Sequence, residues 1–247
     1  MPSRMVAAMP LDAKHVSDPP AGPGPHHVRF EWGVEGLRSM VEPGALTIVI
    51  DVFVFSTTVS VAVERGAVAL PVARVVGDPD GTTRDGVFPT ALLDGAAGTE
   101  VALPSRNGAS CTAVAAEAGA IVLAGSFRNA SAVGRYAAAS GRPVSVVAAG
   151  ERWSDGTLRV AFEDLVAAGA VLSAFGTGDL SPEAQAAIGA FDAVRDDLPA
   201  RLLACRSGRM MSDRGHARDV ELAAKLDVTD LVPVFDGRRV RAARDRS

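Results

Sequence analysis

Short apolar runs alternate with longer mixed segments along most of the chain, and this alternation predicts the fold class. The apolar runs are rich in valine and isoleucine, as in LTIVIDVF (46–53) and PVSVVAAG (143–150). Runs of about four to eight such residues are typical of buried strands, and the segments between them have the length of helices. Strands that are apolar throughout need cover on both faces. We therefore predict an α/β fold: a mostly parallel sheet with helices on both faces and a helical C-terminal portion over 181–226.

The two ends of the chain differ in composition from its middle. Residues 1–27 are rich in Pro, Gly and Ala and lack the apolar centre of a signal peptide, so we predict a disordered tail there. Residues 28–236 are predicted to form a single α/β domain, and 237–247 a solvated basic tail. Within the domain, the Gly- and Asp-rich segment 77–98 is a long excursion between two predicted strands, and loops of that length are often functional.

Charge and cysteine content exclude several kinds of partner. A formal net charge of −4 gives no electrostatic reason to expect a nucleic acid or an anionic membrane surface. No apolar run approaches the roughly 20 residues needed to cross a bilayer. The two cysteines form neither a disulfide framework nor a metal-ligand spacing, which favours a reducing, cytoplasmic location. We leave a homodimer open.

Polar segments follow four of the predicted strands: DVFVFSTT, LPSRNGAS, AGSFRNAS and AAGERWSDG. In a parallel sheet, the ends of these strands lie at the carboxyl edge, where ligands of open α/β folds bind. The small hydroxyl and amide residues cap helices and leave backbone N–H groups free for an anion, although plain capping explains any single segment. Asp51 lies inside an apolar run, and a buried carboxylate needs a compensating partner.

Lysine is rare in this chain, and that narrows the ways an anion can be bound. Lys14 and Lys225 are the only lysines among 25 basic residues, and no GxxxxGK[ST] loop is present. We therefore expect any anion to be held by arginine, by backbone N–H groups or by a metal ion.

Five segments occur in the order found in the 2-phosphosulfolactate phosphatases of coenzyme M biosynthesis, and the chain resembles that family from Leu46 to Val234. The resemblance is carried by IDVFVFSTTVSVAVERGA, LPSRNGAS, AGSFRNASAV, FEDLVAAGAVL and CRSGRMMSDRGHARDVELAAKLDVTDLVPVF. It implies a Mg²⁺-dependent phosphatase that acts on a small anionic phosphorylated metabolite at the carboxyl edge of the sheet.

The resemblance also implies roles for particular residues. Asp51, Glu163 and Asp164 match the carboxylates that hold or orient the metal ion and take part in catalysis, and Mg²⁺ prefers such oxygen ligands. Adjacent helix positions point about 100° apart, so we expect only one of Glu163 and Asp164 to reach the ion directly. Polar residues expected around the substrate are Asn107, Ser126 and Asn129.

Two departures from the family's pattern concern anion binding. Val54 stands where the family has an arginine, and segment 77–98 lacks clear counterparts of the family's Asp, Asn and Ser. Conversely, Arg106 and Arg128 stand where the family typically has neutral residues. Arginine binds phosphate or carboxylate with two parallel hydrogen bonds. We therefore count Arg106 and Arg128 among the substrate-binding residues and hypothesise that Arg106 takes over the anion-binding role of the family's arginine.

These departures keep two other functions open. One is a diverged enzyme that uses the same pocket for another reaction on a small anionic metabolite. The other is a catalytically silent protein that only binds such a ligand.

Overall fold

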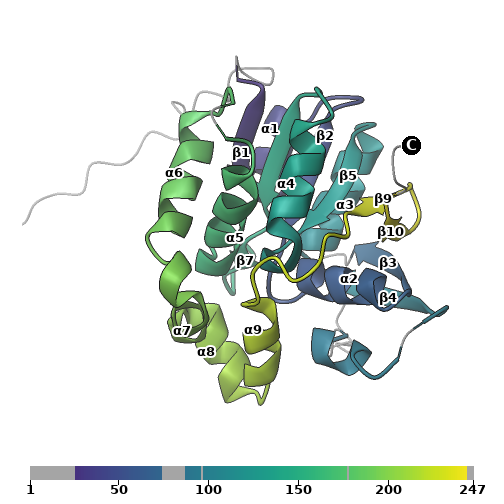
Figure 1. The fold of residues 1–247 in the computed structure, drawn as a ribbon, viewed down its shortest axis with the longest axis vertical. Helices are drawn as coiled ribbons and strands as arrows, with labels where there is room; N and C mark the ends of the chain where they lie inside the picture. The colour runs from purple at the N-terminus through teal and green to yellow at the C-terminus, as the bar shows by residue number, and fades with distance from the viewer. Residues whose placement is uncertain (1–25, 74–86, 96, 177, 244–247) are drawn as a thin grey trace, which may run out of the picture.

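A computed structural model describes residues 26–73, 87–95, 97–176 and 178–243 of the 247-residue chain (Figure 1). Of the disordered tail expected over 1–27, residues 1–25 lie outside the described residues, and so does the part of the excursion over 77–86.

Eight strands of the described chain form one sheet, in the order β1-β6-β2-β5-β9-β10-β3-β4. The first four are parallel neighbours, and β3 and β4 form a second parallel pair. The β9–β10 hairpin joins these two blocks through antiparallel contacts with β5 and β3. The prediction of a mostly parallel sheet is confirmed. The strands are β1 Val28–Trp32, β2 Leu46–Ile50, β3 Val68–Ala73, β4 Glu100–Ser105, β5 Ile121–Gly125, β6 Val144–Ala148, β9 Pro233–Phe235 and β10 Val240–Ala242, and a separate hairpin pairs β7 Glu151–Arg152 with β8 Leu158–Arg159.

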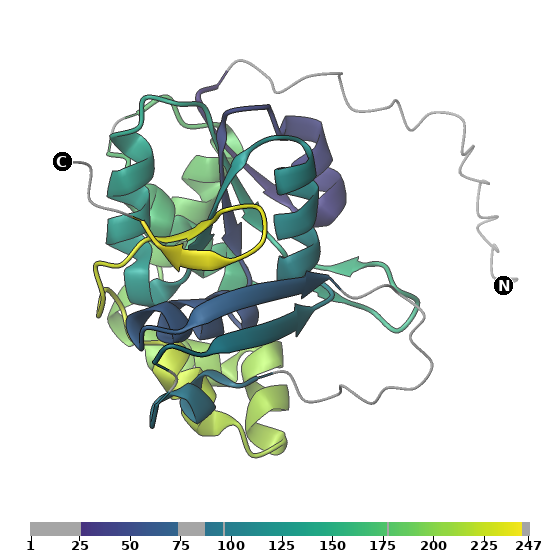
Figure 2. The same ribbon diagram turned by 90° about the vertical axis from the view of Figure 1, so that its right-hand side faces the viewer.

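The β9–β10 hairpin changes the direction of β3 and β4. Three successive antiparallel contacts separate β5 from β3, so β3 and β4 run in the opposite sense to β5 along the sheet. Each step also adds a twist of roughly 20–25°, and Figure 2 shows β3 and β4 lying crosswise to the central strands. We expected all four polar segments at the carboxyl edge of a parallel sheet. The segment after β4 does not belong to that parallel block, and it reaches the others only because the sheet twists.

Helices cover both faces of the parallel block, as predicted. Alternate side chains of β2 point to opposite faces: Ile48 and Ile50 belong to the core under α4, α5 and α6, whereas Val49 packs with Leu37 of α1 and Cys111 of α3. A third apolar cluster lies between α2 and the strands β3, β4 and β10. These helices are α1 Gly33–Met40, α2 Phe55–Glu64, α3 Gly108–Glu117, α4 Ala130–Ala138, α5 Phe162–Ser173 and α6 Pro182–Asp192.

The C-terminal portion is helical, which confirms the prediction for 181–226. After α6 the chain forms the short helices α7, α8 and α9, which lie beyond the end of the sheet near β7 (Figure 1). Their bounds are α7 Leu198–Ala204, α8 Arg206–Asp213 and α9 Ala217–Ala223, and the 3-10 turns of the described chain are η2 Pro89–Leu92, η3 Phe127–Asn129 and η4 Arg195–Asp197.

Both ends of the described chain are more ordered than the sequence suggested. Within the described part of the basic tail expected over 237–247, Val240–Ala242 forms β10, and the Val240 side chain is buried. Because a strand alternates its side chains, one apolar residue between arginines is enough to anchor it. At the other end, His26 belongs to the expected tail, but its Nδ1 lies 2.8 Å from Asp179 Oδ1.

Candidate active site

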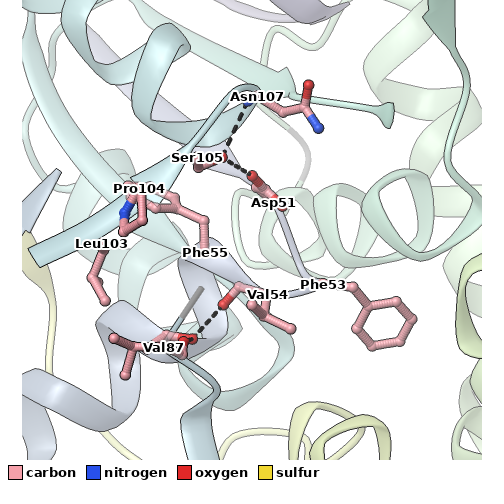
Figure 3. A pocket seen from close by; sticks show the side chains of 10 residues that line it. Asp51, Phe53, Val54, Phe55, Val87, Leu103, Pro104, Ser105 and Asn107 are labelled. Carbon is pink, nitrogen blue, oxygen red and sulfur yellow. Dashed lines mark hydrogen bonds between the residues drawn. The ribbon is translucent and has the colours of Figure 1, made fainter. Parts of the chain in front are cut away.

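Asp51 lies directly after β2 and is bound by the turn that follows β4. Its Oδ2 accepts a hydrogen bond from Ser105 Oγ at 3.0 Å (Figure 3) and another from the Gly108 backbone N–H at 2.8 Å. A Cβ atom at position 108 would lie 2.7 Å from Asp51 Oδ2, so glycine is needed for this close approach. Two segments more than fifty residues apart in sequence are thus joined at one carboxylate.

Burial sets the acidity of Asp51. The pKa of this carboxyl is raised from 3.8 to about 6. Desolvation is the largest cause and repulsion from Glu151 and Glu163 adds to it, whereas the hydrogen bonds from Gly108 and Ser105 act in the opposite direction. Asp51 is therefore a buried acid that still ionises below neutral pH, surrounded by other negative charges.

Asp164 connects the ends of two parallel strands to the start of α5. Its Oδ1 accepts a hydrogen bond from the Val52 backbone N–H at 2.8 Å, and its Oδ2 accepts one from the Gly150 N–H at 2.9 Å. Burial raises its pKa well above the ordinary value, and the charges of Asp51 and Glu163 add to this shift. Both oxygens are used by the backbone, so Asp164 mainly fixes the geometry of the strand ends.

Glu163 is the third buried carboxylate of the group. It lies in the first turn of α5, and its Oε2 accepts a weak hydrogen bond from Cys205 Sγ at 3.6 Å. Burial and the nearby charge of Glu163 raise the pKa of the Cys205 thiol to about 11. The structure thus brings Asp51, Glu163 and Asp164 together at the carboxyl ends of β2 and β6; their catalytic and metal-binding roles remain predictions.

Glu151 belongs to the same group, and the sequence analysis missed it. It begins β7, and its Oε1 accepts a hydrogen bond from Asn107 Nδ2 at 3.2 Å. Its charge also contributes to the raised pKa of Asp51. The signal was present, because Glu151 is the first charged residue of AAGERWSDG, one of the four polar segments after a strand.

A pocket of about 140 Å³ opens beside Asp51 (Figure 3). This is smaller than the roughly 300–1,000 Å³ of sites for drug-sized ligands, so the pocket suits a small metabolite. Glu163 and Asp164 do not line it. Its polar lining residues are Asp51, Thr58, Ser105 and Asn107, and its other lining residues are Phe53, Val54, Phe55, Val87, Leu103 and Pro104.

Arg106 lies between two lining residues, Ser105 and Asn107. It is exposed, and its guanidinium forms no ion pair or hydrogen bond with any residue that the structure describes. Val54, which stands where the family has an arginine, lines the pocket itself. Val54 therefore lines the pocket, whereas Arg106 stands in the chain between two residues that line it.

The three residues expected from AGSFRNAS are not at this pocket. Asn129 Oδ1 accepts hydrogen bonds from the backbone N–H and the Oγ of Ser126, and Asn129 Nδ2 donates to the backbone oxygens of Ala124 and Leu231. The buried Arg128 forms an ion pair with Glu64 at the end of α2. The structure gives the polar groups of Ser126, Arg128 and Asn129 internal partners, and their contact with substrate remains a prediction without geometric support.

The carboxylates of this group meet the needs of a Mg²⁺ ion only in part. Among the described residues, no group of three or more His, Cys, Asp or Glu side chains is arranged to hold a metal ion. Mg²⁺ needs fewer, because it commonly takes one or two carboxylates and completes its octahedron with water and phosphate oxygens. Asp51 Oδ1 and Glu163 Oε1 accept no hydrogen bond from a described residue. The residues present fit such a site.

Fold and site together define the class: an α/β protein with a small pocket beside the buried carboxylate of Asp51 at the strand ends, where ligands of such folds bind. A protein-family model described as 2-phosphosulpholactate phosphatase matches residues 86–238. The chain is also 28% identical over 215 residues to a curated 2-phosphosulfolactate phosphatase of Methanothermobacter thermautotrophicus, an alignment that covers 80% of this chain and 90% of that protein. The chain therefore belongs to the 2-phosphosulpholactate phosphatase family, a family of phosphatases. No helix in the described residues is both long and apolar enough to span a membrane.

Proposed function

We propose that this protein is a Mg²⁺-dependent phosphatase that hydrolyses the phosphate ester of a small phosphorylated acid, 2-phosphosulfolactate or a close relative. The observation that carries the proposal is Asp51, a buried carboxylate with one unbonded oxygen, set at a small pocket and surrounded by three further carboxylates. Family membership supports the reaction class, and the pocket volume supports a small substrate.

Asp51 is the proposed general base. With a pKa of about 6 it is ionised at neutral pH, and general bases work best when their pKa lies close to the working pH. Its Oδ1 accepts the proton of the attacking water, while Ser105 and Gly108 hold Oδ2 in place. The water oxygen bonds to phosphorus while the bond from phosphorus to the ester oxygen breaks, and the proton taken up by Asp51 balances the one that the ester oxygen gains from solvent as it leaves as the alcohol.

Arg106 and Asn107 are the proposed phosphate-binding residues on the rim of the pocket. Arg106 is an exposed cation without a described partner, and its guanidinium matches the geometry of phosphate oxygens. Asn107 Nδ2 is held by Glu151 at 3.2 Å, which fixes the orientation of the amide. This pair compensates for Val54, which supplies no charge.

Glu163 is the residue proposed to hold Mg²⁺, through Oε1, which accepts no hydrogen bond from a described residue, so that Asp51 Oδ1 stays available as the base. A bound Mg²⁺ neutralises phosphate charge and polarises the phosphoryl group. The four acidic side chains repel one another in the absence of a cation, because the charged neighbours that shift the pKa values of Asp51 and Asp164 are all negative. Asp164 and Glu151 act as positioning residues.

The test is phosphate release from 2-phosphosulfolactate and from a panel of small phosphorylated acids, with Mg²⁺ and with a chelator. We expect release that stops with the chelator and returns when Mg²⁺ is added in excess. Release that continues in the chelator would overturn the metal dependence, and the absence of release from every compound would overturn the phosphatase assignment for this chain.

Val54 in the pocket favours a second candidate, a diverged relative that binds the same ligands and does not hydrolyse them. A ligand that binds only the native state raises the unfolding temperature. Stabilisation by the phosphorylated acids without phosphate release would support a binding protein, and a new product without free phosphate would support another reaction in the same pocket.

A further inference from the structure

The β7–β8 hairpin holds a buried arginine that has no acidic partner. Three arginines are buried within the described residues: Arg29, Arg128 and Arg159. The first pairs with Glu42 and the second with Glu64. Arg159, only 8% exposed, donates from Nη2 to Ser207 Oγ at 2.9 Å and lies within salt-bridge distance of no carboxylate in the described chain. A buried charge without a counter-charge is costly, and a bound anion would remove that cost.

A second cation adjoins Arg159 across one aromatic ring. The guanidinium carbon of Arg159 lies 5.9 Å from the centre of the Trp153 ring, and that of Arg206 lies 5.0 Å from it. Each contact is favourable by itself, but the two positive groups around one ring repel each other. Arg206 also begins α8, where Ser207 supplies the hydroxyl that Arg159 contacts. Two guanidinium groups thus lie over one ring, and a hydroxyl contacts one of them.

The cluster lies next to the candidate active site. Arg159 is the cross-strand partner of Glu151 in the hairpin, so their side chains leave the same face. Glu151 accepts a hydrogen bond from Asn107, which lines the pocket. On the other side, Cys205, two residues before Ser207, donates to Glu163. The cluster is thus linked to the carboxylate group on one side through Glu151 and on the other through Cys205.

We propose that Arg159, assisted by Arg206 and Ser207, binds the second acidic group of the substrate, a carboxylate or sulfonate, while the phosphate lies at the Asp51 pocket. The inference rests on the proposed function and adds the group that selects the substrate. A small phosphorylated acid carries at least two anionic groups, and the four carboxylates, Asp51 and its three neighbours, would repel the second one. Arg159 supplies a cation at a separate point and so discriminates acids from neutral phosphate esters.

The experiment compares two phosphate esters that differ in the acidic group only, phospholactate and isopropyl phosphate, with the complete Mg²⁺-supplemented enzyme. We expect Arg159→Gln to lower kcat/KM for phospholactate by about 10- to 100-fold, the size of a charged hydrogen bond, and to change kcat/KM for isopropyl phosphate by less than about twofold. Arg159→Lys keeps the positive charge but loses the paired N–H donors of the guanidinium, so we expect kcat/KM for phospholactate to recover in part. A purely structural role would lower both values equally, and that result would overturn the proposal.

Arg195→Gln is the matched control, because Arg195 also lies over an aromatic ring, 5.7 Å from the centre of Phe191, on a different part of the surface. We expect it to leave the ratio of the two kcat/KM values unchanged, and an equal change in this control would contradict a specific role for Arg159.

A calorimetric measurement tests the same proposal if neither ester is hydrolysed. Phospholactate then serves as a stable ligand beside inorganic phosphate. We expect Arg159→Gln to weaken phospholactate binding about tenfold or more relative to inorganic phosphate. Lack of turnover with this selective loss would overturn the phosphatase assignment alone, whereas equal binding of phospholactate by the wild type and by Arg159→Gln would overturn the role of Arg159.

Discussion

Two of the polar segments that link a strand to the next helix, here called junctions, have nearly the same sequence, but one is open to the pocket and the other is enclosed by the protein. SRNGAS (105–110) follows β4, and SFRNAS (126–131) follows β5; each places Arg-Asn at the start of a helix. In the first, Arg106 is exposed and Asn107 lines the pocket. In the second, Arg128 is buried on Glu64, and Asn129 makes all its hydrogen bonds inside the protein.

Position in the sheet explains the difference. β4 is an edge strand, so the chain that follows it meets solvent, whereas β5 lies between β2 and β9. The segment before β9 also covers the second junction, because the backbone N–H groups of Val228 and Thr229 donate to the Arg128 carbonyl oxygen. A local motif thus predicts a helix start, but the neighbouring strands decide whether its side chains face a ligand.

The largest effect is expected at Asp51, which the first junction holds in place. Asp51→Asn removes the proposed base while keeping the size of the side chain, and we expect kcat to fall by about 10²- to 10⁴-fold. Steady-state phosphate release measures it. Asp192→Asn, at an exposed carboxylate of α6, is the control and should keep its activity. Full activity in Asp51→Asn would remove the first junction from the catalytic site.

Arg128→Gln tests whether the side chains of the second junction serve only the interior of the protein. The substitution removes the charge that pairs with Glu64, whose side chain is 33% exposed, and leaves space where the guanidinium was buried. We expect the free energy of unfolding to fall by about 3 kcal/mol, near the lower end for a broken buried pair. Chemical denaturation measures this loss. Because Arg128 does not line the pocket, kcat/KM per folded molecule should stay within about twofold; a large loss of kcat/KM in a stable variant would show that the second junction reaches the substrate.

The pH dependence of stability separates the two junctions further, because only the first surrounds a titrating carboxyl. The folded-state pKa of Asp51, about 6, lies above its ordinary value of 3.8, so between these pH values the native state binds more protons than the unfolded state. Without added metal, the free energy of unfolding should therefore fall as pH rises from 4 to 6, by about 2 kcal/mol for this group. Asp51→Asn removes this slope, and the difference between wild type and variant measures it. Identical pH profiles would contradict the raised pKa.

The smallest effect is expected for Arg106→Gln. The exposed side chain contributes little to folding, so the free energy of unfolding should change by less than about 0.5 kcal/mol. Removal of a phosphate-binding group should lower kcat/KM about tenfold, equivalent to about 1.4 kcal/mol. A loss of kcat/KM without a loss of stability in Arg106→Gln, and the reverse in Arg128→Gln, would confirm that the first junction faces the ligand and the second does not. Unchanged anion affinity and turnover in Arg106→Gln would disprove the idea that Arg106 compensates for the uncharged Val54.

The sequence by itself determined the secondary structure and much of the site. Valine- and isoleucine-rich runs such as 46–50 and 144–148 became central parallel strands, because a strand buried on both faces has to be apolar throughout. Asp51 was recognisable as the one charge in such a run, and the family resemblance implied a shared site with Glu163 and Asp164.

Tertiary structure alone decided which strand ends meet. The basic segment around Val240 forms β10, which pairs with β3 on one side and with β9 on the other. That insertion reversed β3 and β4, and the twist of the sheet then carried Ser105 to Asp51. A hydrogen bond from Asn107 connects Glu151 to the site, whereas an ion pair with Glu64 holds Arg128 away from it. Hydrophobic periodicity is a local property of the sequence, and it shows whether a residue is buried. Which residues become its neighbours depends on strand order and twist, and these involve residues far apart in the chain.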